Sequence, residues 1–421
     1  MENPKIRFKG FTKDWEQRKL KEIADKVSEK NKNNEFSEPF TNSAEQGIIS
    51  QKDYFDREIV NNENLDSYYI VRNDDFIYNP RISVTAPVGP INRNRLGRNG
   101  VMSPLYTVFR THDIDNLYLE FYFKTTKWHR FMKLNGDSGA RFDRFTISST
   151  QFMEMPIPYP MLDEQRKMGE YFDSLDHLIT LHQRKCEQTK KLKKYMLQKM
   201  FPQNGAKVPE IRFDGFTYDW EQRKLGELVK EGILEAPLDG NHGEKHPTSD
   251  EYVDSGIPFL MASDIHNGEV NIYSCKYITK ERAERLDKGF ARNGDVLLTH
   301  KATIGETAIL SNLMTEYAML TPQVTYYRIK NEERLNREYL YSFFNSLDFQ
   351  TELKTKAAQS TRPYIGITAQ QNLKIILPAE IDEQIRIGLY FRNLDHLITL
   401  HQRKCDELKK MKKYMLQNMF I

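Results

Sequence analysis

The stretch Asp163–Phe201, DEQRKMGEYFDSLDHLITLHQRKCEQTKKLKKYMLQKMF, occurs a second time at Asp382–Phe420, and the two copies match at 28 of 39 positions. The first copy contains no proline and one glycine, Gly169. Each copy therefore predicts a long helix, about 58 Å if it is continuous. Apolar residues recur every seven positions in two rows, although the middle is weak: Met168, Leu175, His182, Thr189, Met196, and Phe172, Ile179, Cys186, Lys193, Met200.

This seam predicts how the two helices pair. One helix cannot bury such a seam alone in water, so we expect an antiparallel pair, coiled-coil-like, with a domain at each end and a pseudo-twofold axis. Residues expected in the seam or against a partner are Leu175, Ile179, His182 and Met196, and Leu394, Ile398, His401 and Met415. The histidines of HLITLHQRK lie about 140° apart on a helix, which suits a polar seam position rather than a metal site.

A second repeat precedes each variable region. Pro4–Leu20, PKIRFKGFTKDWEQRKL, and Pro209–Leu225, PEIRFDGFTYDWEQRKL, are identical at 14 of 17 positions. The predicted segments are a lead-in at 1–20, a variable domain at 21–160, a long helix at 161–203, a repeated lead-in at 204–225, a second variable domain at 226–380 and a second long helix at 381–421. One frame with two different contents predicts two different binding surfaces.

The two variable regions align faintly and predict one α+β fold. Helices are expected near Asn116–Leu134 and Arg337–Lys356. Strands mixed with helices, without regular alternation, argue against a doubly wound parallel sheet. Short strands are expected at Tyr68–Val71, Leu105–Phe109, Pro258–Leu260, Asp295–Leu298 and Gln323–Tyr327.

Composition limits the class of protein. Charged residues make up 29% of 421, yet the net charge is +3, which excludes a simple polybasic coat but not a local basic surface. Cys186, Cys275 and Cys405 form no C-x-x-C pair, so free thiols in a reducing cytoplasm are expected. No apolar run approaches 18 residues and the first residues lack an apolar signal core, so we expect a cytoplasmic protein without membrane contact.

Positive charge is concentrated toward the end of each predicted helix. His182–Met200 contains seven Lys or Arg and one acid, and His401–Met419 contains six and two. Three interpretations stay open: a solvated face, a docking surface for an acidic partner, and a stripe that faces phosphates.

Together these motifs resemble the spacers of type I restriction-modification specificity subunits. The resemblance rests on D-E-Q before a long helix ending in Y-M-L-Q-x-M-F, and on the lead-in G-F-x-x-D-W-E-Q-R-K-L, each present twice. GITAQQNL at Gly366–Leu373, which precedes Ile376-Leu377-Pro378 and the second D-E-Q, adds to it. The resemblance covers the whole chain in the right order.

The resemblance implies a clamp in which each domain reads one half of a split double-stranded DNA sequence and the spacers fix the distance between halves. It also implies that the spacers bind two methyltransferase subunits, which supply S-adenosylmethionine and the adenine chemistry. A motor-nuclease subunit would use ATP and Mg. This chain is then expected to bind no cofactor or metal and to be a non-catalytic subunit.

Catalytic motifs are missing from the sequence, as this reading requires. Gly240–Lys245, GNHGEK, has the wrong spacing for a phosphate loop. Tyr78–Arg81, YNPR, lacks the second proline and the aromatic end of an adenine-methylation motif. Asp163-Glu164 and Asp382-Glu383 suit helix N-termini electrostatically, so we give them no general acid/base role.

Base edges are read mainly by Arg, Lys, Asn and Gln, while cations on phosphates fix register. In the first domain the candidates are Arg81 after a strand, Arg93, Arg95 and Arg98 in a turn-rich loop, and Arg141 and Arg144 interleaved with Phe142 and Phe145. In the second they are Asn241, His242 and Lys245, His300 and Lys301, and Thr361 and Arg362. The alternatives are a solvated surface for the loop arginines and core packing for the phenylalanines.

Other classes of function stay open at this point. A free-standing repressor would bind specific DNA tightly without methyltransferase subunits. An enzyme would need a clustered-acid or N-P-P-aromatic centre, which we do not find. A plain coiled-coil scaffold would leave the two divergent domains unexplained.

Overall fold

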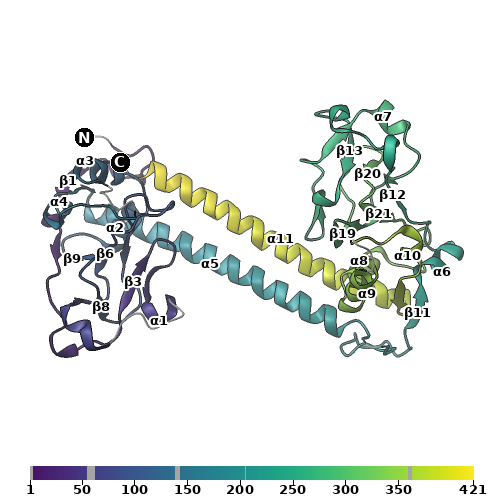
Figure 1. Ribbon diagram of the computed structural model, residues 1–421, viewed down its shortest axis with the longest axis horizontal. Helices are drawn as coiled ribbons and strands as arrows, with labels where there is room; N and C mark the ends of the chain where they lie inside the picture. The colour runs from purple at the N-terminus through teal and green to yellow at the C-terminus, as the bar shows by residue number, and fades with distance from the viewer. Residues whose placement is uncertain (1–2, 55–61, 138–142, 204, 359–362) are drawn as a thin grey trace. The chain divides into compact units, whose positions relative to one another are not determined.

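The computed structural model describes residues 3–54, 62–137, 143–203, 205–358 and 363–421. The chain forms two compact units: unit 1 contains Met1–His182 and Arg403–Ile421, and unit 2 contains Gln183–Gln402. Figure 1 labels the elements of each unit. Each unit thus combines one variable domain with parts of both long helices, and the division falls inside the helices rather than at residues 161, 204 and 381.

Unit 1 is built on a four-stranded antiparallel sheet in the order β2-β9-β6-β7. The strands are β2 (Ala24–Lys26), β9 (Thr107–Thr111), β6 (Phe76–Tyr78) and β7 (Ile91–Arg93). Around it, β3 (Phe40–Ser43) pairs with β4 (Gly47–Ser50), and β5 (Tyr69–Val71) pairs with β8 (Gly100–Met102). Phe76 and Tyr78 join one hydrophobic cluster and Ile77 joins another, so both faces of β6 are covered.

Unit 2 contains the corresponding sheet in the order β12-β21-β18-β19 and a second sheet in the order β16-β13-β20-β17. Of its named strand pairs, β13–β20 is parallel and the others are antiparallel. The first sheet comprises β12 (Leu238–Asp239), β21 (Val324–Tyr327), β18 (Val296–Lys301) and β19 (Thr303–Ile309). The others are β16 (Lys276–Ile278), β13 (Ile257–Leu260), β20 (Ala318–Leu320), β17 (Phe290–Ala291) and the hairpin β14 (Ile265–His266) and β15 (Glu269–Val270).

Short helices accompany these sheets, and two long helices extend from one unit into the other. In unit 1 the short ones are α1 (Gln51–Tyr54), α2 (Asn116–Phe123), α3 (His129–Asn135) and α4 (Ser149–Phe152). In unit 2 they are α6 (Leu225–Lys230), α7 (Lys280–Glu284), α8 (Arg337–Phe344), α9 (Leu347–Ala357) and α10 (Ile367–Gln371). The long helices are α5 (Leu162–Lys199) and α11 (Ile381–Asn418), and 3₁₀ turns lie at Leu20–Glu22, Lys32–Asn34, Asn62–Ser67, Gly243–Lys245, Ser249–Glu251 and Ala262–Asp264. The predicted mixture of helix and sheet is confirmed.

Two predicted helices are each split in the structure. The helix expected at Asn116–Leu134 ends at Phe123, and Trp128 then packs back, donating from Nε1 to the Phe123 carbonyl at 3.0 Å. The helix expected at Arg337–Lys356 ends at Phe344, and the Asn345 amide donates to the Thr307 hydroxyl at 2.7 Å. α2 and α8 therefore end at contacts with side chains beyond each helix. The spacing of apolar residues along one helix does not indicate such contacts.

The repeated lead-in completes each domain as a strand. β1 (Glu16–Lys19) pairs antiparallel with β10 (Pro156–Tyr159), and β11 (Glu221–Lys224) pairs with β22 (Lys374–Leu377). Trp15 packs edge-on against Tyr118 in unit 1, and Trp220 packs in the same way against Tyr339 in unit 2. The frame motif thus joins the beginning and end of each variable region just before its long helix.

The glutamate of each D-E-Q motif clamps the lead-in to the start of the helix. In unit 1 the Arg7 guanidinium donates to both carboxylate oxygens of the fully buried Glu164, at 2.6 and 2.8 Å. In unit 2 Arg212 donates to Glu383 at 2.7 and 2.8 Å. Each buried carboxylate is therefore held in a bidentate pair, a purely structural arrangement.

The glutamine of the motif ties the helix to the variable domain. Gln165 accepts from the backbone N–H of Asp115, the N-cap residue of α2, at 2.9 Å. Gln384 accepts in the same way from the backbone N–H of Asn336, the N-cap residue of α8, at 3.0 Å. D-E-Q is thus the joint between lead-in, domain and helix in both units.

Within each unit the two long helices run antiparallel. In unit 1, Phe172 of α5 stacks on Phe420 after α11, and Leu175, Ile179, Cys405, Leu408 and Met415 belong to the same cluster. In unit 2, Met196 and Leu394 share a cluster, and the Cys186 thiol lies 3.8 Å from the Ile398 carbonyl. The polar seam residues His182 and His401 are both half-buried.

Close packing of α2 or α8 on the long helices requires glycine. A Cβ built on Gly169 would lie 2.5 Å from the Leu117 Cβ, and one on Gly388 would lie 2.7 Å from the Glu338 Cβ. These separations are far below contact distance, so a side chain at either glycine would push the domain helix away.

The arginine clamp gives a stability prediction. Arg7→Ala should lower the free energy of unfolding of unit 1 by about 3 kcal/mol, because Glu164 is left buried without its partner. Arg212→Ala should do the same in unit 2. Denaturant unfolding with a probe in each unit measures both. Lys13→Ala, which breaks the exposed pair with Glu16, is the control and should cost less than about 0.5 kcal/mol. Equal effects of Arg7→Ala and Lys13→Ala would contradict the prediction.

Candidate nucleic-acid interface

The two units bring polar side chains together at equivalent places. In unit 1 an isolated antiparallel bridge joins Arg81, just after β6, to Arg144. In unit 2 an equivalent bridge joins Lys301, at the end of β18, to Tyr364. Because β6 and β18 hold the same position in their sheets, one architectural site carries Arg and Arg in unit 1 but Lys and Tyr in unit 2.

The site in unit 1 presents two guanidinium groups, and within the described ranges only one of them has a carboxylate nearby. Arg81 is exposed, and among the described residues no carboxylate forms an ion pair with it. Arg144 is half-buried, 3.8 Å from the Asp143 carboxylate, and its Nε has no hydrogen-bond partner in the described part of the chain. The exposed guanidinium of Arg81 is therefore suited to acceptors on DNA. Arg141 and Phe142 lie outside the described residues, and Phe145 is buried in the core.

The loop arginines have a different place from the one the sequence led us to expect. Arg93 is largely buried and donates to Glu120 at 2.9 Å and Asp74 at 3.1 Å. Arg95 donates to Glu120 at 2.8 Å and to Asp173 of α5 at 2.9 Å. Burial alone would raise the pKa of Glu120, but Lys124 and these arginines lower it.

The third loop arginine, Arg98, is also neutralised, since it forms a bidentate pair with Glu38 at 2.7 and 2.8 Å. Donors bound to carboxylates reach bases only if those pairs break. Arg93 is therefore a framework residue, whereas Arg95 and Arg98, which are 43% and 48% exposed, lie at the surface in ion pairs, and their contact with DNA stays a prediction.

The helices carry opposite charges at the place where each domain rests on them. Asp173 in the first helix copy binds Arg95, whereas Arg392, the same position of the second copy, lies 3.3 Å from Glu338 of α8. Each helix is thus complementary to its own domain.

The site in unit 2 has an exposed lysine at a strained tip. The Lys301 ammonium lies 6.0 Å from the centre of the Tyr364 ring, and no carboxylate pairs with it among the described residues. The next residue, Ala302, has φ 67°, in the left-handed region that residues with a Cβ rarely adopt. Such strain is typical of functional tips. Thr361 and Arg362 lie outside the described residues.

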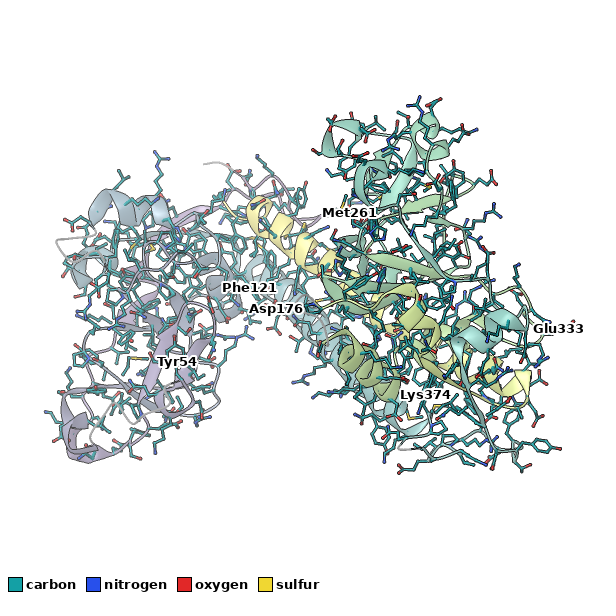
Figure 2. All side chains as sticks on the ribbon, turned by 45° about the vertical axis from the view of Figure 1, so that its right-hand side comes forward. Tyr54, Phe121, Asp176, Met261, Glu333 and Lys374 are labelled. Carbon is teal, nitrogen blue, oxygen red and sulfur yellow. The ribbon has the colours of Figure 1, made fainter. Side chains whose placement is uncertain are left out.

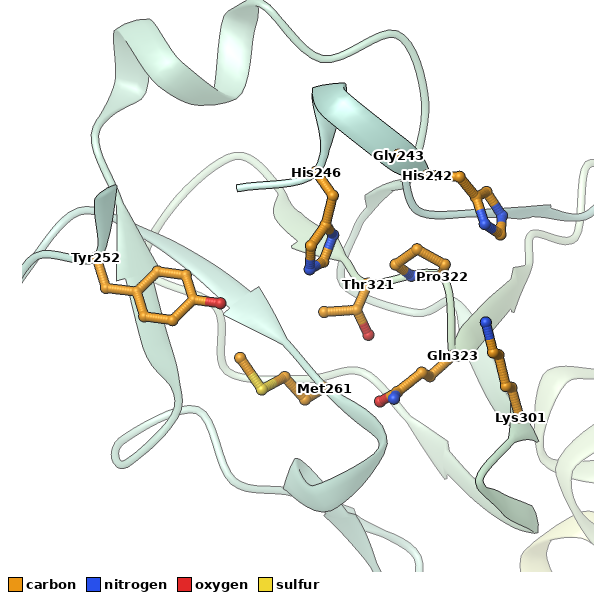
Figure 3. Close-up of a pocket in the computed structure, with 9 residues that line it drawn as sticks. All are labelled: His242, Gly243, His246, Tyr252, Met261, Lys301, Thr321, Pro322 and Gln323. Carbon is orange, nitrogen blue, oxygen red and sulfur yellow. The ribbon is translucent and has the colours of Figure 1, made fainter. Parts of the chain in front are cut away.

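A pocket of about 470 Å³ opens beside this tip (Figure 3). Figure 3 shows His246, Thr321 and Gln323 around one hollow, with the Tyr252 hydroxyl facing it. The Thr321 hydroxyl and His246 Nδ1 are buried without a partner in the described part of the chain. Unpaired buried donors and acceptors are costly, so they favour a polar ligand such as a base edge. The full lining is His242, Gly243, His246, Tyr252, Met261, Lys301, Thr321, Pro322 and Gln323.

The loop candidates of unit 2 fall into exposed and internal groups. His242 is exposed at the pocket, 2.9 Å from the Asp239 carboxylate. Lys245 is exposed but pairs with Asp287. Asn241 is buried and donates to the Lys288 carbonyl at 3.0 Å, so its amide shapes the loop rather than facing solvent.

His300 lies in the core. Its side chain is fully buried, Nδ1 is 3.0 Å from the Ile365 carbonyl, and Nε2 is 3.9 Å from the Asp239 carboxylate. Burial lowers the pKa of His300 to about 4. Burial alone would raise the pKa of Asp239, but hydrogen bonds from Lys288 and His242 lower it. The imidazole therefore reaches no base edge in this conformation and instead supports the tip that bears Lys301.

Sequence reasoning missed most of the pocket. Tyr252, Met261, Thr321 and Gln323 come from separate loops and strands, so no local motif joins them. The only sequence signal is the polar, glycine-punctuated loop around His242.

A second surface lies on the long helices, within the basic stretches for which a docking surface was one of the open interpretations. Leu192 and Tyr195 in unit 2 and Met411 and Tyr414 in unit 1 are exposed at the same positions of the two helix copies. Lys191 and Lys194, and likewise Lys410 and Lys413, flank them and form no ion pair among the described residues. Exposed apolar residues next to free lysines are typical of docking surfaces.

The described ranges lack two other kinds of site. They contain no group of three or more His, Cys, Asp or Glu side chains able to hold a metal ion. They also contain no helix both long and apolar enough to cross a membrane.

The same fold and repeat occur in known proteins. A family model described as type I restriction modification DNA specificity domain matches residues 12–191 and again 218–410. The MjaVIII type I restriction enzyme specificity subunit of Methanocaldococcus jannaschii is 24% identical over 332 residues, 76% of this chain and 73% of that protein. The EcoBI specificity subunit of Escherichia coli is 23% identical over 260 residues, 57% of this chain and 52% of that protein.

A solved structure supports the fold independently. The S subunit of a type I restriction-modification system from M. genitalium aligns with a TM-score of 0.60 at 12% identity, covering 100% of this chain and 99% of that one. Two unlike polar surfaces on one repeated frame define a protein with two DNA recognition domains. The chain belongs to the type I restriction-modification DNA specificity family, as the sequence motifs predicted, and is a specificity subunit of that system.

The burial of His300 predicts a pH dependence. Histidine in the unfolded chain protonates near its ordinary pKa of about 6.5. The stability that neutral His300 gives unit 2 is therefore fully present above about pH 6.5 and is lost as the pH falls toward about 4. Between about pH 7 and about pH 4.5 the parent should lose about 2 kcal/mol more unfolding free energy than His300→Gln, measured by denaturant unfolding. His266→Gln, at an exposed histidine, should behave like the parent. Parallel pH curves for parent and His300→Gln would refute the assignment.

Proposed function

We propose that each recognition domain reads one half of a bipartite double-stranded DNA target. The single observation that carries this proposal is the equivalent bridge, Arg81 with Arg144 in unit 1 and Lys301 with Tyr364 in unit 2. The two units share nearly identical lead-ins and long helices but carry different side chains for contacts with bases at this equivalent bridge. Two different half-sites are the direct consequence of such an arrangement.

The base contacts in unit 1 are assigned to Arg81 and Arg144. In unit 2 they are assigned to Lys301, His242 and the polar wall of the pocket, namely Thr321, His246 and Gln323. The residues Arg141, Thr361 and Arg362 stay proposals from sequence alone. Lys245 pairs with Asp287, so this lysine can contact a phosphate only if the phosphate replaces the Asp287 carboxylate.

The long helices are proposed to form one antiparallel rod that relates the two domains by a pseudo-twofold axis and sets the separation of the half-sites. Antiparallel packing inside each unit supports this arrangement. The exposed pairs Leu192 with Tyr195 and Met411 with Tyr414 are proposed to dock two methyltransferase subunits. Their repetition at identical positions supports two copies of one partner.

Catalysis is proposed to be delegated to these partners. Methyltransferase subunits would use S-adenosylmethionine, and motor-nuclease subunits would use ATP and Mg. The glutamates of the repeated D-E-Q motif, Glu164 and Glu383, are bound by Arg7 and Arg212, which supports a structural role for them.

Exchange of residues 21–160 for the equivalent domain of another family member tests the modular reading. Methylation mapping of a genome in cells that carry the exchanged chain with its methyltransferase subunits should show one changed half-site and one unchanged half-site. The unexchanged chain is the control. A motif with both halves changed, or with neither changed, would show that the domains do not read separate halves.

Removal of single cations tests the assigned sites. Arg81→Ala should relax base preference in one half of the motif, and Lys301→Ala should do so in the other, each weakening binding to the intact target about tenfold or more. Lys9→Ala and Lys230→Ala remove exposed cations from the lead-in and from α6 and should leave both halves unchanged. Binding to a library of targets at fixed salt measures the effect. A loss that is uniform over all sequences would identify phosphate contacts instead.

A further inference from the structure

Two ion pairs join the long helices to each other, and each lies inside one unit. In unit 1 the ammonium of Lys412 on α11 lies 2.5 Å from the carboxylate of Asp176 on α5. In unit 2 the ammonium of Lys193 on α5 lies 2.5 Å from the carboxylate of Asp395 on α11. The lysines occupy the same position of the two helix copies, and so do the aspartates.

These pairs are in the seam rather than on the outer surface. The Lys193 and Lys412 side chains are only 16% and 17% exposed. Both lysines fall on the seven-residue pattern that is otherwise largely apolar, where each interrupts a row of Phe, Ile, Cys and Met side chains. Burial lowers the pKa of Lys412, whereas its hydrogen bond to Asp176 opposes this change. An ammonium in such a place needs its carboxylate.

Each pair also contacts the recognition domain of its unit. Lys412 Nζ lies 5.2 Å from the ring centre of Phe121 on α2, and Figure 2 labels Phe121 and Asp176. Lys193 Nζ lies 5.6 Å from the ring centre of Tyr341 on α8. The Tyr341 hydroxyl donates to Asp395 at 3.1 Å. The helix pair and the domain helix therefore meet at these charges.

Both pairs have the same antiparallel register. Lys193 follows Asp176 by 17 residues on α5, and Lys412 follows Asp395 by 17 residues on α11. An apolar pattern with a seven-residue repeat tolerates a shift of seven residues, because apolar positions again meet apolar positions. The ion pairs do not tolerate it. In unit 1 such a shift would set Asp176 opposite Cys405 or Met419, and in unit 2 it would set Asp395 opposite Cys186 or Met200.

We propose that Lys193 with Asp395 and Lys412 with Asp176 form a register lock that makes the chain select one spacing between the two half-sites. The inference rests on the proposed bipartite function. A shift of seven residues moves one helix along the other by about 10 Å, which corresponds to about three base pairs of DNA. The four residues are positioning residues, since none of them is assigned to DNA. Polar side chains at otherwise apolar seam positions fix register in paired helices generally.

The test uses the full chain with its methyltransferase subunits and a library of targets in which the number of base pairs between the half-sites varies. The double variant K193M/K412M keeps a long apolar side chain at both seam positions, so the helices stay paired, but it leaves Asp176 and Asp395 without their lysines and should lower the melting temperature. Methylation at targets with the wrong spacing, relative to the parent spacing, should rise about tenfold or more. The control K190M removes a lysine that pairs with Glu187 on the exposed face of α5 and should leave spacing unchanged.

Two further variants keep the proposal falsifiable if the methionine variant folds poorly. D176N/D395N preserves shape but removes the carboxylates, and it should relax spacing in the same way. The reversed pairs, made by D176K/K412D together with K193D/D395K, should restore the parent spacing. Folded variants that all keep the single parent spacing would overturn the register lock. If the parent chain itself directs methylation to no bipartite target, the proposed function fails and not the lock alone.

Discussion

Burial of an apolar row that repeats every seven residues along α5 and α11 is the constraint on which the rest of the structure depends. Neither helix can cover its own row, so each unit contains a segment of both helices, packed antiparallel. Phe420 completes the core of unit 1 on Phe172, and Phe201 completes that of unit 2 on Phe391. Within each unit the helix seam is therefore continuous with one hydrophobic cluster of the domain.

The frame motifs then fix how a domain meets its helix. In unit 1 the buried Glu164 holds Arg7 of the lead-in. The neighbouring Gln165 accepts a hydrogen bond from Asp115, the N-cap residue of α2, and Gly169, one turn later, lets α2 approach the long helix closely. All three contacts recur in unit 2 through Arg212, Gln384 and Gly388. Because these joints contact each domain at the start of α2 or α8, the loops and sheets beyond them are free to differ. The second sheet of unit 2 and its pocket are one result of that freedom.

Local repetition made the long helices, the lead-in and the family predictable from sequence. The D-E-Q motif and the seven-residue pattern are contained in single stretches, and the structure has α5 and α11 within two residues of the expected bounds. Features that depend on distant partners were not predictable in this way. Arg93 and Arg95 read as free loop cations because nothing local indicates that Glu120 of α2 faces them. His300 read as a surface residue, although its strand places it in the core.

The charge reversal between Asp173 and Arg392 has a consequence for chimaeras built from this chain. The two helix copies look interchangeable, yet at this position the charge of each copy is complementary to its own domain. A chimaera that placed the domain of unit 1 on the second helix copy would bring Arg95 toward Arg392. Two like charges would then meet where unit 1 has an ion pair. Whether a domain is compatible with a helix copy therefore depends on the charge at this helical position. A working chimaera must keep the residue at this position together with its domain.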